Sequence, residues 1–328
     1  MTGFVKNECL ICSNKISKFL DFGDMPIANG FLKKEEFENE YFFRMETAFC
    51  NQCKTFQLLN QPEAQKMFHE NYAFYSGTSN YMKVHFEKFY HYVYNNFLNN
   101  KKNPFVVEIG SNDGILLQHF LKNKFKHLGI EPSKNVHLKA QENGINSTNI
   151  FFNENSASDI VRKYGKADVF MAANVMCHIP NILSVVKGID KLLKDDGVIV
   201  FEDPYLGDVI KKTTFDQIYD EHTFLFSAHC IKNIFKKYNF ELIDLLPQTA
   251  QGGSMRYVLA RENKYQKKDN INKILNDEIN IGLTKIQTFE KFKNNCEKFK
   301  INFKDLLFDI KSKGKSIAGF AATSKSTT

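Results

Sequence analysis

Four of the seven cysteines fall into two close pairs, Cys9-x-x-Cys12 and Cys50-x-x-Cys53. Two thiolates spaced in this way can bind one ion from a tight turn, so two such pairs supply the four sulfur ligands of a tetrahedral zinc site. The alternatives are four unrelated buried cysteines or a redox pair, but a redox Cys-x-x-Cys is expected beside a β-α-β unit and none adjoins. Because four thiolates leave no coordination position open, we expect a structural Zn²⁺.

A glycine-containing turn runs from Glu108 to Gly114, after a short apolar strand pattern and before a helical one. An α/β sheet binds adenosine-bearing ligands at such a turn. Glu131 ends the next strand pattern and could accept hydrogen bonds from both ribose hydroxyls. The spacing G-x-x-x-G lacks the third glycine of a dinucleotide site, and no Walker lysine is present, so it favours S-adenosylmethionine over a plain structural turn. The candidate cofactor-binding residues are Glu108, Gly110, Ser111, Asn112, Gly114, Glu131, Pro132, Asn153 and Asn174.

Two histidines lie near the ends of strand patterns on the same side of the predicted sheet. His178 follows the third strand pattern, and Tyr219-Asp-Glu-His222 follows the fourth. Histidine is the natural general base near neutral pH, and a carboxylate such as Glu221 can orient it. A single histidine is more often a hydrogen-bonded structural residue. The position of these two in one crevice indicates a catalytic role.

Strand and helix patterns alternate from residue 104 onward, which predicts a mainly parallel sheet with helices on both faces. We therefore expect an α/β, Rossmann-like methyltransferase core. The predicted units are a zinc-binding module (1–62), a helical connecting segment (63–103), the adenosylmethionine-binding domain (104–262) and a C-terminal segment (263–328). In the last unit, residues 269–311 read as one long helical stretch, and residues 316–320 read as the start of another strand.

The net charge of +7 over 328 residues could suggest a nucleic-acid partner, but only four of the 44 basic residues are Arg. Specific contacts to phosphates and bases rely on Arg, so we expect no nucleic-acid partner. The sequence has no apolar run of membrane-spanning length and no export signal at its N-terminus. We therefore expect a cytoplasmic protein without membrane contact, as a monomer or weak dimer.

These features together resemble the sugar C-methyltransferase family, which acts on deoxysugars of antibiotics and bacterial glycans. The resemblance covers essentially the whole chain. Besides the cysteine pairs and the glycine turn, five further segments carry this resemblance: Tyr72 to Ser76, Asn174 to His178, Phe201 to Tyr205, Tyr219 to His222 and Gly252 to Arg256. It implies a zinc-binding N-terminal domain, an adenosylmethionine domain and a C-terminal domain that helps to hold the nucleotide of the sugar.

The resemblance also assigns roles to individual residues. His222 would be the general base that removes a proton from the carbon beside a 4-keto group. Tyr219, Glu221, His178 and a tyrosine of the Tyr72/Tyr75 loop would position the nucleotide-linked sugar or stabilise its enolate. Family members continue well beyond Ser324, so we expect that the nucleotide-binding part of the C-terminal domain is mostly missing here.

Other functions fit parts of the pattern. The same base could serve O-methylation of a hydroxyl on a nucleotide-activated hexose or heptose for a bacterial surface glycan. A nucleotide-sugar dehydrogenase would need the missing third glycine. A zinc-dependent interaction module would not bind adenosylmethionine. An RNA methyltransferase would be expected to show aromatic residues interleaved with Arg, and Arg is scarce.

Overall fold

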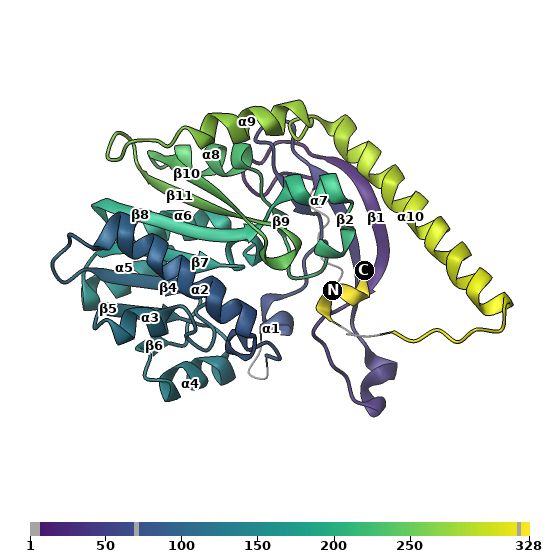
Figure 1. Ribbon diagram of the computed structural model, residues 1–328, viewed down its shortest axis with the longest axis horizontal. Coiled ribbons are helices and arrows are strands. Elements are labelled where there is room, and N and C mark those ends of the chain that lie inside the picture. Colours follow the sequence, from purple (N-terminus) through teal and green to yellow (C-terminus); the bar gives the residue numbers. More distant parts are fainter. Residues whose placement is uncertain (1–6, 69–71, 320–322) are drawn as a thin grey trace.

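A seven-stranded sheet forms the centre of the computed structural model, which describes residues 7–68, 72–319 and 323–328 (Figure 1). The strand order is β10-β11-β8-β7-β4-β5-β6, and β11 alone runs in the direction opposite to the other strands of this sheet. This arrangement confirms the predicted Rossmann-like fold. The strands are β4 (Phe105–Ile109), β5 (Lys126–Ile130), β6 (Ser147–Thr148), β7 (Ala167–Ala173), β8 (Leu193–Pro204), β10 (Phe240–Gln248) and β11 (Ser254–Arg261).

Helices cover both faces of this sheet because its strands are apolar on both sides. In β4, Phe105, Val107 and Ile109 pack into one core, whereas Val106 packs into the other. Such alternation follows from the two-residue period of a strand. One face is covered by α5 (Glu154–Tyr164), α6 (Ile182–Leu192), α8 (Ala228–Lys236) and α9 (Asn270–Asn280), and the other by α2 (Asn80–Val93), α3 (Leu117–Lys122) and α4 (Lys134–Glu142).

The chain reverses its direction of travel across the sheet between β4 and β7. From β4 the order proceeds outward to β5 and β6, and from β7 it proceeds the other way to β8. Ligands of open α/β sheets bind outside the carboxyl ends of the strands at such a switch point. The fold therefore places the ligand crevice beyond Ile109 and Ala173.

A second sheet joins the N-terminal unit to the core. It contains β1 (Ser17–Pro26), β2 (Phe42–Phe49) and β3 (Phe56–Leu58), all antiparallel, and its fourth strand is β9 (Phe224–Leu225) from the methyltransferase core. The main-chain N–H of Leu58 also donates to Thr223 at 2.8 Å. The short helix α7 (Leu206–Lys212) packs into the same core as this junction, and the chain continues from β3 to the short helix α1 (Ala64–Met67).

The C-terminal segment differs from the prediction in two respects. The helical stretch expected over 269–311 is divided into two helices, α9 and α10 (Ile286–Ser312), because Gly282 adopts a left-handed φ of 79° between them. The expected strand at 316–320 is also wrong over its described part, since residues 316–319 have no strand partner and remain exposed coil. Phe320 lies outside the described residues.

None of the helices in the described part of the chain combines the length and the apolar character needed to cross a bilayer.

Candidate active site and metal cluster

A cavity of about 420 Å³ lies at the carboxyl ends of β4, β5, β7 and β8. It brings together residues from the N-terminal unit, the sheet and the C-terminal segment. The predicted site residues that line it are Tyr72, Gly110, Asn112, Glu131, Pro132, Asn153, Asn174, His178, Tyr219, Glu221 and His222.

Four predicted site residues lie outside the lining. Glu108 and Ser111 belong to the glycine turn, but their side chains are buried and do not line the cavity. Gly114 packs against Ile145. Tyr75 lines a separate surface cleft, where its hydroxyl accepts a hydrogen bond from the side-chain amide of Asn135 at 2.9 Å. Of the two loop tyrosines, Tyr72 is therefore the one that lines the cavity.

Close packing within the protein requires glycine at two positions of the glycine turn. Gly110 and Gly114 both adopt positive φ. A Cβ on Gly110 would lie 2.2 Å from a methyl carbon of Val175, so even alanine would not fit at this position. These glycines allow a tight turn beside the cavity whether or not a ligand is bound.

Glu131 fixes the turn from the neighbouring strand. One carboxylate oxygen accepts the main-chain N–H of Asn112 at 3.0 Å, and the other accepts that of Ser133 at 2.8 Å. A carboxylate oxygen has two lone pairs, so each can still accept a hydroxyl from a ligand. The residues present thus fit the ribose contact expected of adenosylmethionine.

Buried acidic groups lie close together at this end of the sheet. Burial and the nearby carboxylates of Glu131 and Asp113 raise the pKa of Glu108. Burial also raises the pKa of Glu131 itself. A ligand that carries positive charge, such as a sulfonium nucleoside, relieves this repulsion. The side-chain oxygen of Asn174 is buried and has no partner among the described residues, so it is an available acceptor.

His222 also lines the cavity, and its ring orientation is fixed. Its Nδ1 lies 2.6 Å from the main-chain carbonyl oxygen of Gln217. A carbonyl can only accept, so Nδ1 carries the proton and Nε2 keeps its lone pair. Burial and then the neighbouring His178 lower the pKa of His222 well below its usual value. The ring is therefore neutral near pH 7 and can take up a proton at Nε2.

The other polar groups lie around that ring. The ring centroids of His178 and His222 are 5.2 Å apart, and the hydroxyl of Tyr72 donates to Glu221 at 3.4 Å. Nδ1 of His178 lies 3.8 Å from the carboxylate of Glu221, while its Nε2 has no partner within the described residues. Burial lowers the pKa of His178 to about 4, so both histidines are neutral. This arrangement can accept a proton and donate hydrogen bonds to an oxygen.

Three residues that sequence reasoning missed support this wall. Asn29 donates to the carboxylate of Glu221 from its side-chain amide, and the main-chain N–H of Ala28 donates to Asp220 at 3.2 Å. Lys325 lines the cavity from the C-terminal segment. Asn29-Gly30 is a residue pair typical of turns. Nothing in the local sequence indicates that Asn29 contacts a residue almost 200 positions away.

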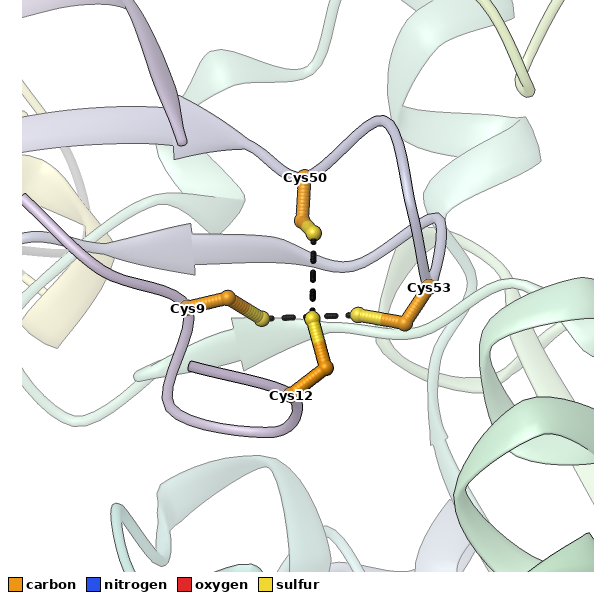
Figure 2. A group of neighbouring side chains, drawn as sticks. All are labelled: Cys9, Cys12, Cys50 and Cys53. Atoms are coloured by element: carbon orange, nitrogen blue, oxygen red, sulfur yellow. Dashed lines mark hydrogen bonds between the residues drawn. The ribbon is translucent and has the colours of Figure 1, made fainter. Parts of the chain in front are cut away.

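The four paired cysteines form the metal cluster that the spacing predicts. Their sulfur atoms all lie within 4.8 Å of one another and point toward a common centre (Figure 2). The Cys9–Cys53 and Cys12–Cys50 sulfur pairs are 3.4 and 3.5 Å apart. This set of four thiols fits a tetrahedral Zn²⁺, and it lies beside α8, where Asn233 donates to the carbonyl of Cys53 at 3.1 Å.

We expect Cys9→Ser to lower the zinc content and the melting temperature, because a serine hydroxyl is a far poorer zinc ligand than a thiolate. Metal analysis and thermal unfolding of the purified variant would measure both. The matched control is Cys296→Ser on α10, away from the cluster. Zinc content equal to that of the wild type in Cys9→Ser would contradict the assignment.

A second prediction concerns the effect of pH on stability. Burial and the charge of Asp220 raise the pKa of Glu221 from 4.5 to about 7. Glu221 binds its proton more tightly in the folded chain than in the unfolded chain, so the protonated group stabilises the fold at low pH. This contribution is lost as the pH rises from the unfolded-state pKa of 4.5 to the folded-state pKa of about 7. Ionised Glu221 thus costs on the order of 3 kcal/mol at alkaline pH.

Glu221→Gln should therefore raise the free energy of unfolding, and more at about pH 8.5 than at about pH 5.5. Denaturant unfolding at the two pH values measures the difference. Glu290→Gln, on the exposed part of α10, is the control. A gain that does not grow with pH would show that burial of the Glu221 charge carries no such cost.

Family models match three consecutive segments of the chain. The matches are a "Putative zinc binding domain" (9–68), a "Methyltransferase domain" (83–245) and a "C-methyltransferase C-terminal domain" (249–328). A curated relative is the C-methyltransferase NovU of Streptomyces niveus, which is 24% identical over 324 residues. The alignment covers 97% of this chain and 76% of NovU.

Solved structures also align with part of the chain. Magnesium protoporphyrin IX methyltransferase from Synechocystis PCC 6803 is 12% identical with a TM-score of 0.43, covering 55% of this chain and 83% of that chain. An S-adenosylmethionine-dependent methyltransferase from Anabaena variabilis is 16% identical with a TM-score of 0.44, covering 55% of this chain and 86% of that chain.

The family matches follow the order of the three parts seen in the structure: the cysteine cluster, the sheet with its glycine turn, and the C-terminal helices. The chain is therefore an S-adenosylmethionine-dependent methyltransferase, with a match to a zinc-binding domain before its methyltransferase domain and a match to a C-methyltransferase C-terminal domain after it.

Proposed function

We propose that the protein transfers a methyl group to the carbon beside a keto group of a nucleotide-linked deoxysugar, with His222 as the general base. The observation that carries this proposal is the geometry of His222. Its Nδ1–H donates to the carbonyl of Gln217, which leaves the lone pair on Nε2, and the residue lines the same cavity as the glycine turn and Glu131. The similarity to the C-methyltransferase NovU supports a carbon acceptor.

The proposed cofactor, S-adenosylmethionine, supplies an electrophilic methyl group on a positively charged sulfur. Glu131 would hold its ribose hydroxyls, and Asn112, Asn153 and Asn174 would provide further polar contacts at the same end of the cavity. The acidic groups beneath the turn favour its positive charge. The residues proposed to hold the methyl donor and the proposed base thus line one cavity.

Nε2 of His222 would remove the proton from the carbon next to the keto group. The C–H electron pair becomes a carbon–carbon double bond, and the carbonyl pair moves to oxygen as an enolate. The same carbon would then form the bond to the methyl group as the methyl–sulfur bond of the cofactor breaks, which leaves S-adenosylhomocysteine, restores the carbonyl and lets the proton on His222 pass to solvent. Tyr72, Tyr219, His178 and Glu221 would position the sugar, since their side chains share this wall.

The second candidate is O-methylation of a sugar hydroxyl, for which the free Nε2 of His222 would serve equally well as the base. The two reactions give products of the same mass. Product NMR after incubation with a panel of nucleotide-linked sugars distinguishes them, because a new C–CH₃ signal and a new O–CH₃ signal differ in chemical shift. A methyl signal on oxygen would overturn the carbon assignment and leave the role of His222 to be tested.

Glu131→Gln should weaken binding of S-adenosylhomocysteine about 10- to 100-fold, since hydrogen bonds to a charged acceptor contribute roughly 1.5–3 kcal/mol. Isothermal titration calorimetry measures the affinity. Glu142→Gln, an exposed residue on α4, is the control. Wild-type affinity in Glu131→Gln would remove the ribose contact from the proposal.

His222→Ala should lower the methyl-transfer rate by roughly 100- to 10,000-fold, the usual contribution of a general base. Binding of S-adenosylhomocysteine should stay close to wild type, because His222 is not among the residues proposed to hold the cofactor. The control is His91→Ala on the exposed face of α2. Substantial turnover by His222→Ala would contradict the role of this residue as the base.

A further inference from the structure

The segment 323–328 returns from α10 to the cavity and contributes to its wall. Ser324 and Lys325 line the cavity together with Tyr219, Glu221 and His222. The hydroxyl of Thr328 donates to the main-chain carbonyl of Ile218 at 2.7 Å, which ties the segment to the start of the Tyr219–His222 loop. Lys325 is the only Lys or Arg among the described residues that line the cavity.

Hydrogen bonds connect Lys325 to the proposed base. Its ammonium donates to the side-chain oxygen of Gln251 at 3.2 Å. The side-chain amide of Gln217 donates to the main-chain carbonyl of Gln251 at 2.9 Å, and the carbonyl of Gln217 in turn accepts the Nδ1–H of His222 at 2.6 Å. The positions of the ammonium and of the imidazole are thus set by the same two glutamines.

The charge of Lys325 has no carboxylate partner within the part of the chain that the structure describes. Gln251, which is neutral, accepts its hydrogen bond, and Asp216 acts on it only at longer range. Burial lowers the pKa of Lys325, since removal of an ammonium from water without a counter-charge is unfavourable. An ammonium in this situation binds an anionic oxygen when one enters the cavity.

We propose that Lys325 is a catalytic residue whose ammonium donates a hydrogen bond to the acceptor oxygen on which negative charge develops as His222 removes the proton. This inference rests on the proposed function. The proton passes from carbon to Nε2 of His222, the carbonyl electron pair moves to oxygen, and Lys325 stabilises that oxygen until the carbon–methyl bond forms. The interaction is strongest in the transition state and therefore acts on the rate more than on substrate binding.

The test follows proton removal without methyl transfer. The full chain is incubated in D₂O with a thymidine diphosphate-linked 4-keto-6-deoxyhexose and S-adenosylhomocysteine, and NMR follows the loss of the proton beside the keto group. Lys325→Met keeps the length of the side chain and removes the charge, and Lys325→Arg keeps the charge. Lys315→Met, in the exposed coil before the segment, is the matched control.

We expect Lys325→Met to slow exchange roughly 100-fold with little change in KM, the loss typical for removal of one oxyanion donor. Lys325→Arg should recover part of the rate, and Lys315→Met should match the wild type. Unchanged affinity for S-adenosylhomocysteine in all variants shows that they are folded.

Wild-type exchange by Lys325→Met would overturn the role of Lys325 and leave the proposed function intact. A rise in KM without a change in rate would also overturn it, because the ammonium would then bind a fixed anion such as the diphosphate. If the wild-type chain neither exchanges the proton nor methylates this sugar, the proposed function fails and the inference fails with it.

Discussion

The pairing of β3 with β9 is the interaction on which the rest of the site depends. The segment that carries Tyr219, Glu221 and His222 is almost fully buried, with exposed fractions of 7%, 2% and 3%. Buried polar groups need hydrogen-bond partners, and the N-terminal unit supplies two of them here: the N–H of Leu58 donates to the carbonyl of Thr223, and the N–H of Ala28 donates to the carboxylate of Asp220. The zinc cluster organises the unit that provides those partners. The N-terminal unit is therefore part of the active site and not a separate appendage.

This burial has an electrostatic cost. Burial raises the pKa of Asp203 to about 8, and that of Asp220 to about 6, so carboxyl groups in the region of the proposed base resist ionisation. A fold selected for stability alone would not place such groups together, whereas active sites commonly do. The same burial removes water from around His222 and keeps it neutral, which a proton acceptor requires. Stability is reduced at the wall where the proposed chemistry occurs.

The sequence allowed prediction of the features that local patterns encode. Two-residue cysteine spacing, a glycine turn after an apolar strand and polar residues at strand ends each have a short-range signature, and most of the residues predicted from them line one cavity or one cluster. Asn29 and Ala28 were missed because their importance comes from contacts between segments far apart in the chain. The break at Gly282 was missed because the flanking residues keep helical spacing on both sides. The strand expected at 316–320 is the opposite case, in which the local pattern predicted an element that residues 316–319 do not form. A strand needs a neighbouring edge, and the local sequence does not specify one.

Carbon and oxygen acceptors differ less in the base they need than in the negative charge that must be stabilised on the substrate. A sugar hydroxyl loses its proton to a base as it attacks, so a neutral imidazole alone can assist it. A carbon beside a keto group is a weaker acid in practice, because its reaction develops a full negative charge on a distant oxygen that must be stabilised. A cation positioned by the same glutamines as the base has little use in the first reaction and a direct use in the second. The position of Lys325 beside Gln251 therefore favours carbon as the acceptor, independently of any similarity to other proteins.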